Sequence, residues 1–149
     1  MLLKKKSNQM KVSNSLKDEI YTLLVDRGIN ADVAKVMLAQ MAFETKNFKS
    51  NLATKYNNFA GITYVTRHKD KGYGKTYSVA DGNNFVIFPS VADFVDDYIY
   101  VLKLPRYNNA WNDSNLLTFV QRLKQGGYFT ASEKEYYDGV LNYYVNFWA

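Results

Sequence analysis

Apolar residues recur at helical spacing in the first part of the chain, after a polar, lysine-rich segment over residues 1–12. Ser15-Leu16-Lys17-Asp18 has the form of a capping box, in which side chains of the first turn bond exposed backbone amides. The apolar positions that follow on one face are Leu16, Ile20, Leu23 and Leu24. The pattern predicts a flexible basic arm over residues 1–12 and then a helix that ends near Gly28, a residue type common at helix C-termini.

A second helix is predicted directly after Asn30, a residue type that caps helix N-termini. Over residues 33–43 only Lys35 and Gln40 are polar, so the helix is apolar on nearly all sides. A helix with this pattern is normally buried on most of its surface. It ends at Glu44, and a carboxylate is therefore placed at the end of a buried element.

The helical pattern breaks over residues 57–61, and two short segments with strand character follow, Ile62–Thr66 and Phe85–Phe88. The segment between them is polar and contains glycines. This arrangement predicts a small hairpin or irregular β lobe with a mobile loop.

Three more helices are predicted in the remainder of the chain. Ser90-Val91-Ala92-Asp93 can cap a helix that ends before Pro105, and Ser114 can cap a helix closed by Gly126-Gly127. Ser132-Glu133-Lys134-Glu135 can cap the last one. Two helices, a small β lobe and three helices make an α+β fold that is mainly helical.

The composition is that of one globular domain, which we assign to residues 13–149. The chain has 149 residues, of which 47% are hydrophobic and 22% charged. Tyrosine is unusually frequent, with thirteen copies. Tyrosine has an apolar face and a polar tip, which suits both the edge of a core and a carbohydrate-binding groove.

Charge and residue usage exclude several classes of function. The net charge of +5 favours polyanionic partners, but beyond Lys4-Lys5-Lys6 the basic residues are scattered, so we expect no nucleic acid partner. Without cysteine and with His68 as the single histidine, thiolate catalysis and a His-rich metal site are excluded, and we expect no cofactor. No segment reaches transmembrane length, so we expect no stable membrane insertion.

Glu44 is the candidate for acid chemistry. It follows the apolar residues 41–43 and precedes Phe48, and apolar surroundings raise the pKa of a carboxyl group. A general acid needs such a raised pKa in order to hold its proton near neutral pH. The alternative is a partly exposed glutamate at a helix end, paired with a lysine such as Lys46.

Short motifs along the chain resemble those of glycoside hydrolase family 73. The first are Ala39-Gln40-x-x-x-Glu44-Thr45, Ser50-x-x-Ala53 and Asn57-Asn58-Phe59-Ala60-Gly61-Ile62. The later ones are Phe88-Pro89-Ser90, Phe94-x-x-Asp97-Tyr98, Arg106-Tyr107-x-x-Ala110 and Gly127-Tyr128-x-Thr130, with Tyr136 or Tyr137 beyond. Each motif is short, but the ordered set spans about residues 15–145 and is fairly specific.

The resemblance implies a lysozyme-like, two-lobed fold in which a general-acid glutamate ends a buried helix at the cleft between the lobes. It maps that role onto Glu44. It also implies an endo-acting N-acetylglucosaminidase that cleaves the glycan strands of peptidoglycan. Family members include bacterial autolysins, flagellar muramidase-like proteins and phage lysins.

Four further residues are candidates for substrate binding, each with a structural alternative. Asn57 and Asn58 would shape the loop beside the acid, or they are turn residues whose side chains bond their own backbone. Tyr107 and Tyr128 would line the sugar groove, or they pack at the rim of the core. Gly61 is interpreted as a backbone requirement.

The second catalytic carboxylate is the main departure from the family. Many members carry a glutamate in a Thr-x-Glu-Tyr stretch of the β lobe, whereas residues 75–82 contain none. Asp81 is the candidate substitute and Asp70 a weaker one, although Asp-Gly pairs such as Asp81-Gly82 are also common turns. Asp97 is interpreted as structural.

Smaller departures are Ala60 in place of the usual Phe, Thr63 in place of Lys, and Phe88 in place of Tyr.

Two alternative functions stay open. One is a muramidase or lytic transglycosylase on the same fold, since a single acid could suffice for that chemistry. The other is a non-catalytic wall-binding or virion structural protein, favoured by the missing glutamate. The intact segment 39–45 favours activity, because a costly carboxylate beside an apolar helix would serve no purpose in an inactive protein.

Delivery to the wall is a separate question. No apolar stretch follows the lysines of residues 4–6, so the N-terminus is not an ordinary signal peptide. We expect phage delivery, holin-type release, a non-Sec export route, or a leader outside this sequence. We expect a monomer unless the chain is part of a virion or secretion assembly.

Overall fold

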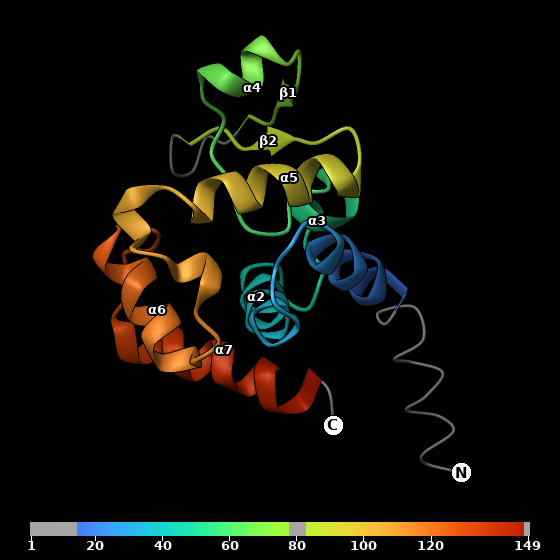
Figure 1. Ribbon diagram of the computed structural model, residues 1–149. Helices are drawn as coiled ribbons and strands as arrows, with labels where there is room; N and C mark the ends of the chain where they lie inside the picture. The colour runs from blue at the N-terminus through green and yellow to red at the C-terminus, as the bar shows by residue number, and fades with distance from the viewer. Residues whose placement is uncertain (1–14, 78–82, 148–149) are drawn as a thin grey trace.

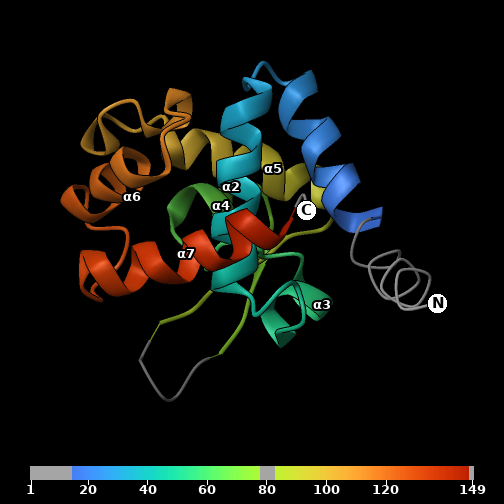
Figure 2. The same cartoon turned by 90° about the horizontal axis from the view of Figure 1, so that it is seen from below.

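Helix α2 (Ala31–Glu44) lies at the centre of the fold, and the other long helices pack around it (Figures 1 and 2). The computed structural model describes residues 15–77 and 83–147. The basic arm predicted for residues 1–12 lies outside these ranges. Asn30 caps α2, its side chain accepting a hydrogen bond of 2.8 Å from the Asp32 amide, as predicted. Nine of the fourteen residues of α2 are buried, which confirms a helix covered on nearly all sides.

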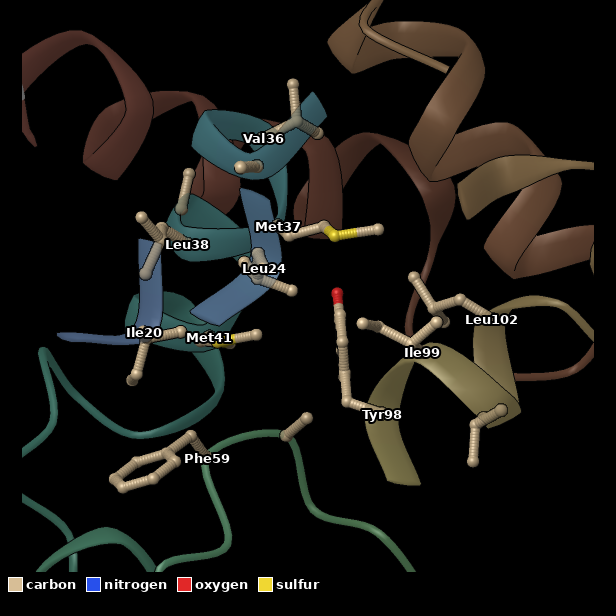
Figure 3. Close-up of a cluster of buried hydrophobic side chains, with 14 of the residues drawn as sticks. Ile20, Leu24, Val36, Met37, Leu38, Met41, Phe59, Tyr98, Ile99 and Leu102 are labelled. Atoms are coloured by element: carbon tan, nitrogen blue, oxygen red, sulfur yellow. The ribbon is translucent and has the colours of Figure 1, made fainter. Parts of the chain in front are cut away.

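Three helices cover α2. The N-terminal helix spans residues 15–26 and reverses at Gly28, where φ is +92° and a glycine is favoured. Helix α5 (Val91–Leu102) begins at the predicted Ser90 cap, and α7 (Glu133–Phe147) begins after Ser132. Figure 3 shows side chains from the N-terminal helix, α2 and α5 converging in one cluster. The labelled members are Ile20, Leu24, Val36, Met37, Leu38, Met41, Phe59, Tyr98, Ile99 and Leu102.

Helix α6 (Leu116–Gln125) begins one residue later than predicted. Its cap is Asn115, which accepts a hydrogen bond of 3.1 Å from the Thr118 amide, so the prediction of Ser114 was wrong. Asp113 accepts a hydrogen bond of 3.0 Å from the Asn115 amide and thereby fixes the turn that makes Asn115 the cap. Two short 3₁₀ helices that were not predicted, η1 (Pro105–Tyr107) and η2 (Ala110–Asn112), connect α5 to α6.

The β lobe lies on the far side of α5 from α7 (Figure 1). Its strands β1 (Gly74–Lys75) and β2 (Val86–Ile87) are antiparallel, with Gly74 opposite Ile87 and Lys75 opposite Val86. Two short helices, α3 (Asn51–Tyr56) and α4 (Thr66–Asp70), lie before the strands in the chain.

The predicted strand over Ile62–Thr66 was wrong. Only Thr63 forms an isolated bridge, to Phe85, and the chain then enters α4 at Thr66. The reason is the ring of His68, whose Nδ1 accepts a hydrogen bond of 3.0 Å from the Val65 amide. That bond provides the Val65 amide, at the start of α4, with an acceptor. In a strand, the amide would need a carbonyl of a neighbouring strand instead.

Asp97 of α5 joins the helical lobe to α4, which confirms its interpretation as structural. Arg67 donates to both oxygens of Asp97, at 2.9 and 3.0 Å, and His68 lies 2.9 Å from Oδ2. Nδ1 of His68 accepts a hydrogen bond from the Val65 amide, so the ring hydrogen is on Nε2. Nε2 therefore donates a hydrogen bond to Asp97. Burial raises the pKa of Asp97, but the bonds from Arg67 and His68 outweigh burial and hold the pKa below its ordinary value.

We expect Asp97→Asn to lower the free energy of unfolding by about 3 kcal/mol near pH 7, because it leaves the half-buried Arg67 and the buried His68 poorly paired. The lowered pKa of Asp97 means that its contribution is complete above the ordinary Asp pKa of about 4 and is lost as the pH falls through the folded-state value. Urea unfolding of both proteins from pH 7 down to pH 2 checks this. Equal stability at pH 7 would contradict the assigned role.

Candidate active site

Glu44 is the last residue of α2, and the chain turns sharply after it. After Thr45, the residues Lys46, Asn47 and Phe48 all have φ between 51° and 63°, a left-handed run that is uncommon without glycine. Thr45, fully buried, holds this turn: its hydroxyl donates to the Met41 carbonyl at 2.7 Å and accepts from the Phe48 amide at 2.9 Å. Glu44 is partly exposed, as the alternative expected, but it forms no ion pair with Lys46, so the lysine pairing of that alternative was wrong.

One oxygen of Glu44 is held by α7. The Tyr136 hydroxyl donates to Oε1 at 2.6 Å, although the two residues are 92 positions apart. The Tyr136 ring is fixed between Phe129, stacked at 3.7 Å between centroids, and the edge of Phe43 at 4.9 Å. Helix α7 approaches Phe43 at Gly139, where a Cβ atom would lie 2.1 Å from the Phe43 ring. The glycine therefore permits the close packing that places Tyr136 on Glu44.

The other oxygen of Glu44, Oε2, lies beside Gly61, and both residues line an open pocket. A Cβ atom at Gly61 would lie 3.9 Å from Oε2, and Gly61 has φ of +65°, so the interpretation of Gly61 as a backbone requirement is confirmed. The pocket has a volume of about 360 Å³. It is lined by Phe43, Glu44, Ala60, Gly61, Tyr128, Phe129, Thr130, Ala131 and Tyr136.

The electrostatics of the pocket favour a protonated carboxyl group. Burial raises the pKa of Glu44, and the hydrogen bond from Tyr136 lowers it by a smaller amount, so the net pKa lies above its ordinary value. Burial also raises the pKa of Tyr136 well above its ordinary value, so the phenol stays a neutral donor. A carboxyl group with a raised pKa, open to a pocket through one oxygen, can donate a proton to a bound molecule.

A second pocket, of about 220 Å³, adjoins the first and shares Gly61 and Tyr128 with it. Arg67 and Arg106 line it, and no carboxylate does. The two adjoining pockets are together called the groove below. Glu44 lines its first pocket, and Arg106 and the Asp97-paired Arg67 line its second.

Asn58 acts within the protein. It is fully buried, its Nδ2 donates to the carbonyls of Ile62 at 2.9 Å and Val86 at 3.1 Å, and its Oδ1 accepts from the Ile62 amide at 3.0 Å. Asn57 has left-handed backbone geometry and donates to the Phe88 carbonyl at 3.2 Å. These bonds join the side chains to backbone groups of Ile62, Val86 and Phe88, so the asparagines shape the loop beside the acid, which is the first predicted role. Direct sugar contact by Asn58 was wrong, because no atom of it reaches the surface. These bonds hold the loop that carries Gly61 beside Glu44.

The two tyrosines differ in their access to the groove. Tyr128 lines both pockets and donates to the Ala60 carbonyl at 2.7 Å. Tyr107 lines only the second pocket and is 3% exposed, packed against Tyr128 and below Gly126. Tyr128 is thus placed beside Glu44, whereas Tyr107 belongs mainly to the core rim.

The structure does not assign a second carboxylate. Asp81 lies outside the described residues, and Asp70 is exposed at the end of α4 and lines neither pocket. Among the described residues, Glu44 is the one carboxylate that lines the groove. Within the same residues no cluster of three His, Asp or Glu side chains could hold a metal ion. None of the described helices combines the length and apolar character needed to span a membrane.

Two residues of the site were missed as functional candidates. Tyr136 had appeared only as one of two possible family matches, and its contact with Glu44 is long-range. Gln40 is fully buried and bonds to Tyr136, its Nε2 lying 3.2 Å from the phenol oxygen. Its signal was present in the sequence, since it is one of two polar residues within an otherwise apolar stretch.

The pattern of a family described as mannosyl-glycoprotein endo-beta-N-acetylglucosaminidase, the glucosaminidases, matches residues 19–147. A solved peptidoglycan hydrolase from Sphingomonas sp. A1 shares the fold, with a TM-score of 0.64 and 21% identity over 91% of this chain and 90% of that one. A mutant of that hydrolase has a TM-score of 0.60, with 21% identity over 92% and 90% of the chains. No curated protein sequence matches significantly. The predicted resemblance and the mainly helical, lysozyme-like fold are confirmed.

We expect Tyr136→Phe to raise the pKa of Glu44 above its value in the wild type, because the substitution removes the hydrogen bond that favours the carboxylate. The carboxyl group should then deprotonate at higher pH, a shift that an NMR titration of the Glu44 side chain would follow. Tyr137→Phe, in the neighbouring position of α7, serves as the control and should leave the midpoint in place. A midpoint that falls or stays constant in Tyr136→Phe would contradict the arrangement.

Proposed function

The chain belongs to the glucosaminidase family of glycoside hydrolases, and from this premise we propose that it cleaves the glycan strands of peptidoglycan with Glu44 as the general acid. The observation that carries the proposal is the difference in surroundings between the two carboxyl oxygens of Glu44. Oε1 is bonded to Tyr136 and Oε2 faces the groove, in surroundings that raise the carboxyl pKa.

In the proposed reaction the proton on Oε2 passes to the glycosidic oxygen while the bond from that oxygen to the anomeric carbon breaks. The carboxylate that forms on Glu44 is stabilised by the Tyr136 hydroxyl on Oε1. A water molecule then adds to the anomeric carbon and returns a proton to the carboxylate. Each cleavage leaves one new reducing end.

The proposal also includes a second group, which stabilises the positive charge that develops at the anomeric carbon. Asp81 keeps its predicted role as the helping carboxylate, since residues 78–82 belong to the same segment as the expected second carboxylate of the family. The alternative helper is the N-acetyl oxygen of the substrate, which requires no second carboxylate from the protein. The described lining of the groove contains Glu44 as its one carboxylate, and Asp81 lies outside the described residues, so the choice between the two helpers is left to experiment.

Peptidoglycan is the proposed substrate for two reasons. The solved structures that share the fold are peptidoglycan hydrolases. The net charge of +5 and Arg106 of the second pocket also favour a wall polymer that carries carboxylates. A bacteriolytic role, such as that of a phage lysin, would follow, because cut glycan strands weaken the wall.

A muramidase or lytic transglycosylase reaction is the second candidate. It is favoured by the same observation, a described groove with one carboxylate, because a sugar hydroxyl can replace water in a reaction that uses a single acid.

We expect Glu44→Gln to reduce cleavage of purified peptidoglycan by about a hundredfold or more, because an amide cannot donate the required proton. Mass spectrometry of the digests should show reducing N-acetylglucosamine ends with the wild type. Glu19→Gln, an exposed substitution on the N-terminal helix, is the matched control and should cleave like the wild type.

Other outcomes of this assay would favour a different function or a different acid. Anhydro-muramic or reducing muramic ends would favour the second candidate. Full activity of Glu44→Gln would contradict the assignment of the acid, and no cleavage by the wild type, with wall binding retained, would favour a binding protein. Asp81→Asn in the same assay separates the two helpers, since substrate assistance predicts activity close to that of the wild type.

A further inference from the structure

Gln40 is an amide in a place where a polar side chain is costly. It is fully buried on α2, one helical turn before Glu44, among apolar residues. Its carbonyl oxygen accepts a hydrogen bond from the Tyr98 hydroxyl, and its Nε2 donates to the Tyr136 oxygen at 3.2 Å. Figure 3 shows Tyr98 on α5 with its hydroxyl directed toward α2. The amide thus connects two tyrosines from two helices.

The number of hydrogens in this chain of bonds fixes its direction. A phenol has one hydrogen to donate, and Tyr98 donates its hydrogen to the Gln40 oxygen. The nitrogen of Gln40 must then face Tyr136, and it uses that phenol oxygen as an acceptor. Tyr136 keeps its own hydrogen for Glu44, which receives it on Oε1. All three groups donate toward the carboxyl group.

We propose that Gln40, supported by Tyr98, is a positioning residue that orients the Tyr136 hydroxyl toward Oε1 of Glu44 and so leaves Oε2, on the groove side, to carry the transferable proton. The proposal rests on the proposed function for its effect on catalysis. Its effect on the Glu44 carboxyl group does not depend on that function. A residue that only filled the core would affect stability and leave the titration of Glu44 unchanged.

The test is Gln40→Met, which keeps the length of the side chain and removes its donors. We expect kcat on peptidoglycan to fall about tenfold with little change in KM, because the carboxylate formed during proton transfer loses stabilisation. The alkaline limb of the pH profile should move to higher pH, and the NMR midpoint of Glu44 should rise in parallel. Met37→Leu, fully buried on the same helix, is the control and should move neither.

A double variant tests whether Gln40 acts through Tyr136. In the double variant Gln40→Met, Tyr136→Phe, the alkaline limb of the pH profile and the NMR midpoint of Glu44 should match those of Tyr136→Phe alone. The reason is that the hydroxyl that Gln40 orients is already absent. Tyr98→Phe should move the alkaline limb and the Glu44 midpoint to higher pH, as Gln40→Met does, but by a smaller amount. Because this substitution leaves α2 unchanged, it can replace Gln40→Met if that variant folds poorly.

Additive shifts in the double variant, or an unchanged midpoint in folded Gln40→Met, would overturn the proposal. If the wild type cleaves no glycan, the proposed function fails, but the NMR midpoints still decide the role of Gln40.

Discussion

The burial of Glu44 at the end of an apolar helix constrains the rest of the structure. A carboxyl group removed from water loses its hydration, and the protein must either neutralise the group or supply partners for it. Here the partner is one neutral phenol, which satisfies Oε1 without supplying a countercharge. The group therefore keeps a raised pKa, and the remaining oxygen is open to the groove.

The packing of α7 against α2 determines the position of the Tyr136 phenol. Tyr136 reaches Glu44 because α7 approaches α2 closely at Gly139 and because Phe43 and Phe129 hold its ring. On the opposite side, the bonds of buried Asn58 hold the loop that places Gly61 beside Oε2.

The buried Asp97 and the half-buried Glu44 show how the surroundings of a carboxyl group decide its role. Asp97 receives hydrogen bonds from Arg67 and His68, which outweigh burial and lower its pKa, so it stays ionised and joins the lobes. Glu44 has no cationic partner, so burial dominates and its pKa rises. Opposed shifts of this kind are how a protein separates a structural carboxylate from a catalytic acid.

Local patterns in the sequence predicted the features that depend on neighbouring residues. Asn30 capped α2 as expected, and the apolar stretch together with the motif around it singled out Glu44, whose role as the acid stays a prediction. The strand over Ile62–Thr66 failed because a histidine ring competes for the Val65 amide, a choice that β propensity does not record. Tyr136 could not be assigned from the sequence, because its role depends on the packing of two helices across 92 positions. Asp81 stays a prediction.

The central claim is that Glu44 acts as a protonated acid in the folded protein. The most direct test is the pH dependence of kcat/KM for peptidoglycan cleavage, measured beside the NMR titration of the Glu44 carboxyl group. Because the acid must be protonated and its pKa is raised, activity should fall as the pH rises through a midpoint above the ordinary Glu pKa of about 4.3, and that midpoint should coincide with the titration of Glu44. Activity that increases as Glu44 loses its proton would contradict the account.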